Sequence, residues 1–242
     1  MSEARTEPAG SRSVLRALEI LDLLAATERP LGLAQIAKEF GIPKSSCLAL
    51  LRALCARDFA RQEPGGAYVL GLRTFEVGAA YLRAVTPVGA ATAELRALTE
   101  RLGMTSHFAV LEGDEVVYLA KQDPPGTGVR LASSLGARLS AWTTAVGRAQ
   151  LAFREPVVAA TADGSFEEVR RRGYAVDEGT TAAGIRCVAA PVFGVGGCCG
   201  AVGVSYLMHD GADVPAIADL VVSAAMRVSS ELGGAWAPGQ PR

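Results

Sequence analysis

The chain has 242 residues, of which half are hydrophobic and one fifth are charged, with a net charge of -1. This is the composition of an ordinary soluble globular protein, and it excludes a disordered tail protein, a collagen-like repeat and a disulfide miniprotein. Because the net charge is close to zero, any nucleic-acid-binding surface must draw on a local cluster of basic residues. The small excess of basic residues lies in the N-terminal third, which is the better candidate for a polyanion partner.

Cysteine and histidine usage argues against metal and disulfide chemistry. The five cysteines form no CxxC pair, and His107 and His209 stand far apart. We therefore expect no structural zinc site, no secreted disulfide framework and no cofactor. The polar N-terminus lacks the apolar segment of a signal peptide, so we expect a cytoplasmic protein. The uncharged run from Cys187 to Met208 contains Pro191 and several glycines, which favours two buried strands joined by a hairpin over a membrane span.

The first seventy residues predict three helices and a hairpin. Helical spacing of apolar residues begins at Ser13 and continues for about four turns. A shorter helix over 33–40 is closed by Gly41, at a position that requires a residue tolerant of positive φ. A third helix opens at Pro43, which suits a first helical turn. The segments on either side of Glu63-Pro64-Gly65-Gly66 predict a small hairpin with a glycine turn.

This order of elements is that of a winged helix-turn-helix. A three-helix packing module without DNA contact is the alternative. The third helix opens with Lys44, Ser45 and Ser46, where a recognition helix meets base edges and phosphates. Arg52 lies further along this helix, and Arg61 enters the predicted wing. We predict that these five residues contact double-stranded DNA.

The remainder of the chain predicts a connector and a second domain. The segment 72–83 is a predicted helix that Thr86-Pro87 breaks. Later elements are helices over 88–102, 145–153, 165–172 and 215–232, and strands over 106–111, 116–120, 129–133, 186–193 and 198–206. Because the strands arrive mainly as hairpins, with helices before and after them, they predict an α+β fold with an antiparallel-rich sheet.

Several segments of the chain resemble the IclR family of bacterial transcriptional regulators. They are SRSVLRALEILDLLA, LGLAQIAKEFGIPKSSCLALLRAL, YVLGLRTFEVG in the wing, GARLSAWTTAVGRAQLAF, and RRRGYAVDEGTTAAGIRCVAAPVF followed by GAVGVSY. The resemblance implies a winged helix-turn-helix over 11–71, a connector helix over 72–86 and a GAF-like effector domain over 87–236. It also implies a homodimer or tetramer on operator DNA, whose binding a small organic acid or aromatic effector changes. A repressor is favoured over an activator.

The resemblance further implies an effector pocket. The residues that it places there are Leu131, Leu139, Ala145, Val146, Asp177, Ile185, Cys187, Gly203 and Ser205. Free backbone N–H groups at the helix start near Thr143 would suit a carboxylate, and apolar walls with one or two polar groups suit a small molecule. The alternative is that the large apolar residues of this set are core.

Two positions depart from the family pattern. Leu48-Ala49 stands where the family often has His-Arg, which removes one DNA contact. Ser140-Ala141-Trp142 stands where Pro-x-His is common, and Trp142 either favours a flat effector or packs against the domain.

Enzyme interpretations are weaker. The glycine-rich run 194–200 lies between two predicted strands with no helix after it, so it predicts a hairpin turn and not a dinucleotide loop. Cys187 has apolar neighbours and no histidine close in sequence, which favours a buried small residue over a reactive thiol. A DNA-independent metabolite sensor or adaptor remains the main alternative to a regulator, and an enzyme is a more distant one.

Overall fold

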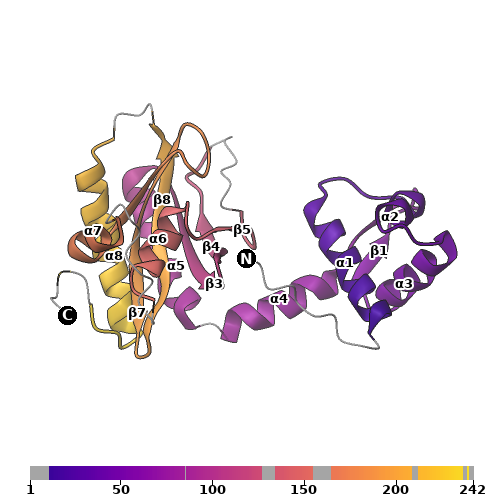
Figure 1. Cartoon of the computed structure of the whole chain (residues 1–242). Helices are drawn as coiled ribbons and strands as arrows, with labels where there is room; N and C mark the ends of the chain where they lie inside the picture. Colours follow the sequence, from indigo (N-terminus) through magenta and orange to yellow (C-terminus); the bar gives the residue numbers. More distant parts are fainter. Residues whose placement is uncertain are drawn as a thin grey trace. The chain divides into compact units, whose positions relative to one another are not determined.

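The computed structural model describes residues 11–84, 86–126, 134–154, 165–208, 212–236 and 239. The chain divides into two compact units, Met1–Tyr81 and Leu82–Arg242 (Figure 1). The predicted strand over 129–133 and Leu131 lie outside the described residues.

The first unit is a winged helix-turn-helix, as the sequence predicts. Its elements are α1 (Arg12–Ala26), α2 (Leu33–Glu39), α3 (Lys44–Ala56), β1 (Ala60–Gln62), β2 (Tyr68–Leu70) and the start of α4 (Leu72–Ala84). Strands β1 and β2 pair antiparallel, and Leu31 adds a bridge to Tyr68. Gly41 has a φ of 60°, which confirms the turn expected between α2 and α3.

One face of each helix holds this unit together. Helix α1 buries Ile20 and Leu24, and α3 buries Cys47, Leu51 and Leu54, which recur every three or four residues along one side. These side chains form a core with Ile36 and Ala37 of α2 and with Ala60 and Tyr68 of the hairpin. The opposite side of α3 therefore faces solvent.

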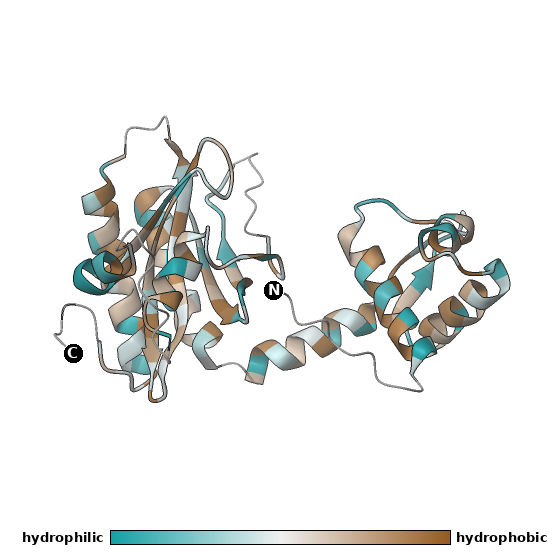
Figure 2. Ribbon diagram, in the orientation of Figure 1, coloured by the Kyte–Doolittle hydropathy of each residue, from teal (hydrophilic) through white to brown (hydrophobic). Residues whose placement is uncertain are grey.

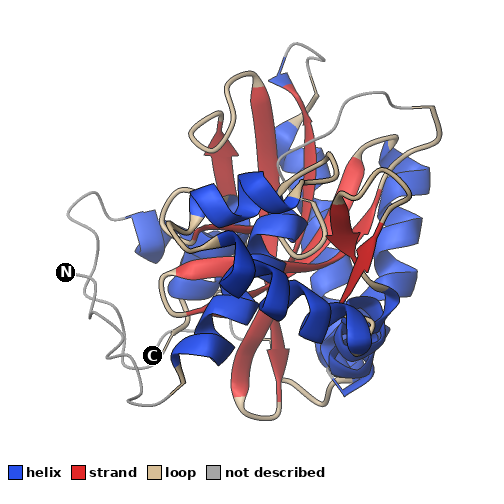
Figure 3. Ribbon diagram, turned by 90° about the vertical axis from the view of Figure 1, so that its right-hand side faces the viewer, coloured by secondary structure: helices blue, strands red, loops and turns tan. Residues whose placement is uncertain are grey.

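The second unit is built on one antiparallel sheet. Its elements are α5 (Thr86–Leu102), β3 (Thr105–Glu112), β4 (Glu115–Gln122), β5 (Arg138–Ser140), α6 (Ala145–Leu151), α7 (Ser165–Arg172), β6 (Ala175–Glu178), β7 (Ile185–Gly194), β8 (Gly197–Leu207) and α8 (Val214–Glu231). The strand order is β5-β4-β3-β8-β7-β6, and each neighbouring pair is antiparallel (Figure 3). This confirms the predicted α+β class and the hairpin in the uncharged run.

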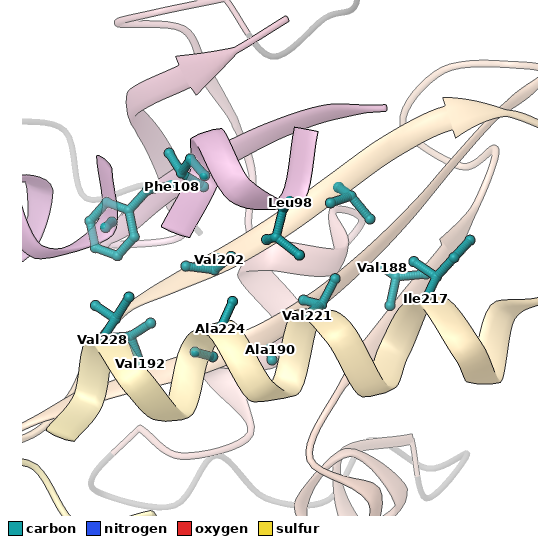
Figure 4. Close-up of a cluster of buried hydrophobic side chains, with 14 of the residues drawn as sticks. Leu98, Phe108, Val188, Ala190, Val192, Val202, Ile217, Val221, Ala224 and Val228 are labelled. Carbon is teal, nitrogen blue, oxygen red and sulfur yellow. The ribbon is translucent and has the colours of Figure 1, made fainter. Parts of the chain in front are cut away.

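Alternation along the strands separates two cores. Helices α5 and α8 cover one face, where Ile217, Val221 and Val228 of α8 lie over Val188 and Val192 of β7 (Figure 4). Helices α6 and α7 cover the other face. Both faces of the central strands are apolar, so these strands appear as hydrophobic stretches in Figure 2.

Helix α4 differs from the other long helices because it buries no residue. Leu72 and Phe75 are each 70% exposed, and Val77 and Tyr81 are exposed as well. This helix begins in the first unit and ends in the second.

Candidate functional site

The start of α3 presents three of the predicted DNA-binding residues. Lys44, Ser45 and Ser46 form its first turn and are exposed. Pro43 stands before the helix in an extended conformation (φ -56°, ψ 141°), so the helix begins one residue later than the proline suggests. Because Cys47 anchors the next position in the core, the polar first turn is held toward solvent.

Arg52 and Arg61 lie together at a groove of about 910 Å³ in the same unit. The groove lies between the C-terminal half of α3, the hairpin and the first turn of α4, and Arg57 and Arg73 also line it. Arg61 pairs with Glu63 at 2.6 Å. Ion pairs at such exposed sites contribute little stability, so the guanidinium is able to exchange its partner for a phosphate. The first turn of α3 does not line this groove.

The junction between the wing and α4 is tightly packed. A Cβ on Gly71 would lie 2.0 Å from the carbonyl oxygen of Asp58, so only glycine fits there. Asp58 itself has a φ of 59°. The Asp58 carbonyl accepts a hydrogen bond from the backbone N–H of Arg73 (3.1 Å), and Phe59 accepts one from Gly71 (2.9 Å). The first turn of α4 is thereby fixed to the end of α3.

In the second unit, a cavity of about 30 Å³ lies at one face of the sheet, beside the start of α6. Six residues of the predicted pocket line it, namely Leu139, Ala145, Asp177, Ile185, Cys187 and Ser205. Sequence reasoning missed four other lining residues, Tyr118, Thr144, Thr181 and Ala182.

Three residues assigned to the pocket lie elsewhere. Val146 is fully buried, and both it and His107 pack against Gly203, where an added Cβ would lie 2.6 Å from His107 Cε1. Trp142 is 43% exposed and packs against Phe166, with ring centroids 6.0 Å apart. Local sequence could not decide between these orientations, because each residue neighbours others that do line the cavity.

The start of α6 is occupied by its own cap. Thr144 Oγ1 accepts a hydrogen bond from the backbone N–H of Gly147 (3.2 Å) and donates one to the Ser140 carbonyl (2.9 Å). The helix has only seven residues. The expectation that free N–H groups here would receive a carboxylate is therefore not supported, because the side chain of Thr144 already serves this end.

The carboxylate of Asp177 is held in place at the cavity by backbone donors. The N–H groups of Thr180 and Thr181 donate to its Oδ1 and Oδ2 at 2.8 and 3.3 Å. Asp177 is 3% exposed and comes from β6, a strand that the sequence pattern does not reveal.

A neutral histidine lies behind the cavity wall. His107 Nε2 is 3.0 Å from Ser205 Oγ and 3.6 Å from Cys187 Sγ, and Tyr118 packs edge-on against the ring. Burial, followed by the charge of Lys121, lowers the pKa of His107 to about 3. Burial also raises the pKa of the Cys187 thiol to about 12, so this cysteine is protonated at neutral pH and is not an activated nucleophile.

Family models match both units. Residues 13–64 match the IclR helix-turn-helix domain, and residues 79–162 and 163–230 match the bacterial transcriptional regulator IclR C-terminal domain. The chain belongs to the IclR family. An IclR-family relative, the HTH-type transcriptional regulator BhcR of Paracoccus denitrificans, is 31% identical over 91% of this chain and 87% of its own length.

Solved IclR structures share the fold. The structure of IclR from Thermotoga maritima matches with a TM-score of 0.76 and 25% identity, over 91% of this chain and 98% of that one. An IclR homologue from Microbacterium hydrocarbonoxydans, complexed with 4-hydroxybenzoate, matches with a TM-score of 0.78 over 91% and 99% of the two chains. At 18% identity, this second likeness concerns the fold alone.

These matches establish the class of protein. The chain is a DNA-binding transcriptional regulator of the IclR family with a ligand-binding C-terminal domain, and not an enzyme. None of the helices in the described ranges is long and apolar enough to cross a membrane.

Proposed function

We propose that this IclR-family regulator is a repressor whose operator affinity is modulated by a small organic effector bound at the cavity beside α6. The observation that carries this proposal is the convergence of Asp177, Cys187 and Ser205, from three different strands, on one enclosed cavity. Enclosed sites with a few converging polar groups are typical of small-molecule binding.

Helix α4 is the proposed coupling element. Its first turn is fixed to α3 through the Gly71 and Asp58 junction, so a displacement of α4 would carry the recognition helix with it. An effector acts through such an element only if it binds one arrangement more tightly than the other.

The operator-bound form is proposed to be a homodimer. Two copies of α3 would then reach half-sites one helical turn apart, roughly 34 Å, on a partly palindromic site. The exposed apolar side chains of Leu72 and Phe75 on α4 support this proposal, because apolar patches of this kind mark protein interfaces.

The DNA face is tested with a double substitution, Lys44→Ala with Arg61→Ala. We expect weaker operator binding and a salt slope lower by about one for each lost phosphate contact. Bound fragments are selected from sheared genomic DNA with the purified protein, and affinity is then measured at several salt concentrations. Arg96→Ala with Arg101→Ala on α5 is the control, since it removes equal charge from exposed positions of the other unit. An unchanged slope in the Lys44/Arg61 variant removes these residues from the interface.

The dimer is tested by placing serine at Leu72 and Phe75. Because both side chains are exposed, we expect the fold to survive while the sedimentation equilibrium shifts toward monomer and operator affinity falls. Val195→Ser is the control, since Val195 is 89% exposed at a hairpin turn away from α4. A dimer that persists in the α4 variant would contradict this assignment.

A further inference from the structure

The cavity beside α6 contains one acid and no base. Asp177 is the only ionisable carboxyl group in its described lining, and no lysine or arginine lines it among the described residues. The nearby cations are engaged elsewhere: Arg148 donates to the Val176 carbonyl (3.2 Å), Arg186 pairs with Glu178 (3.3 Å) and Lys121 pairs with Asp123 (3.0 Å). A ligand carboxylate in this cavity would therefore face Asp177 without a compensating positive charge, which disfavours its charged form.

The other polar groups of the lining are hydroxyls. Tyr118, Thr181 and Ser205 each bring one to the wall, whereas the hydroxyl of Thr144 is already used at both ends by the helix cap. Thr181 Oγ1 is buried and has no hydrogen-bond partner in the described part of the chain. A buried hydroxyl without a partner is costly, and a ligand hydroxyl would satisfy it.

His107 sets the direction of the Ser205 hydroxyl. The neutral ring carries one proton, and Nδ1 is buried with no partner among the described residues. A buried N–H donor left unpaired is the rarer arrangement, so the proton is placed on Nε2, which then donates to Ser205 Oγ at 3.0 Å. The O–H of Ser205 is thereby left to donate into the cavity.

The size of the cavity limits the ligand. About 30 Å³ is room for one or two water molecules. A compact ligand enters with small side-chain shifts, whereas an aromatic ring requires the wall to be rebuilt.

We propose that the effector is a short, uncharged polyhydroxy compound, whose neighbouring hydroxyls donate to Asp177 and accept from Ser205 and Thr181. This inference rests on the proposed function, and it replaces the organic acid or aromatic compound expected from the sequence with a neutral class of ligand. The carboxylate of Asp177 only accepts hydrogen bonds, and Ser205 is held as a donor, so a hydroxyl, which both donates and accepts, matches each of them.

The test compares each polyol with its own carboxylate, on the full chain and without DNA. Isothermal titration is run with glycerol against glycerate and with erythritol against erythronate, and with 4-hydroxybenzoate as the aromatic acid. We expect each polyol to bind on the order of tenfold more tightly than its carboxylate counterpart. Equal or tighter binding of a carboxylate, or no polyol binding, overturns the proposal.

Two variants assign the preference to the cavity. Asp177→Asn removes the negative charge and should narrow the difference between polyol and carboxylate, while Ser205→Ala should weaken polyol binding. Glu178→Gln is the matched control, because Glu178 is the next residue on β6, its side chain is 64% exposed, and it does not line the cavity. A preference that is unchanged in both Asp177→Asn and Ser205→Ala, with native melting curves, contradicts the assignment.

Operator binding then separates this inference from the proposed function. If a polyol binds but leaves operator affinity unchanged, the regulatory role of the cavity fails and the ligand class stands. If glycerate changes operator affinity and glycerol does not, the ligand class fails and the regulator stands.

Discussion

Replacing Gly147 by alanine is expected to destabilise the second unit by about 3 kcal/mol or more, as severe overpacking does. A Cβ at this position would lie 2.2 Å from the carbonyl oxygen of Ala141 and 2.3 Å from its Cα. Both contacts are with backbone atoms, so no side-chain rotation relieves them. The same close approach places Thr144 and Ala145 at the cavity, and the substitution should therefore also abolish effector binding.

Gly89→Ala is the matched control for this prediction. Gly89 lies inside α5 of the same unit, where a Cβ would meet nothing within 4 Å. Alanine in a helix interior is favoured over glycine by about 0.5–1 kcal/mol, so this variant should be more stable than the wild type. Urea unfolding followed by tryptophan fluorescence reports on this unit alone, because both tryptophans, Trp142 and Trp236, lie in it. Effects of the same sign at both glycines would show that the packing at Gly147 is wrongly described.

Acidification is expected to destabilise the second unit through His107. Burial holds its pKa at about 3 in the folded protein, against an ordinary value of 6.5, with Lys121 lowering and Asp123 raising it. The unfolded chain therefore binds a proton first. The contribution of neutral His107 is fully present above about pH 6.5 and is lost as the pH falls toward 3, with a slope approaching about 1.4 kcal/mol per pH unit.

The variant His107→Gln isolates this effect. Glutamine does not titrate, so its unfolding free energy should fall less steeply than that of the wild type between pH 6.5 and pH 4.5. The difference between the two curves is the quantity to measure, since it cancels the titration of the acidic residues common to both proteins. Parallel curves would mean that His107 is not held neutral by burial.

Local patterns were sufficient for most of the architecture. The three N-terminal helices follow from apolar residues at helical spacing, and Gly41 marks the turn because its positive φ is a local requirement. The hairpins of β3 with β4 and of β7 with β8 follow from apolar runs joined by short turns. The short strands β5 and β6 escaped prediction, because three or four residues of mixed polarity carry no period.

The cavity shows where the sequence alone stops. Resemblance to the IclR family indicated six of its lining residues, yet it also indicated Val146, Gly203 and Trp142, which pack elsewhere. Whether a side chain faces a cavity or a core depends on the elements that close over it, and these come from distant parts of the chain. Pairing of β3 with β8 brings His107 to Ser205 across 98 positions. The sequence by itself determined the family, the winged helix and the antiparallel sheet, because those depend on local periods and turns. Only the tertiary structure decided which polar groups meet, and hence the chemistry of the ligand, because long-range strand pairing brings them together.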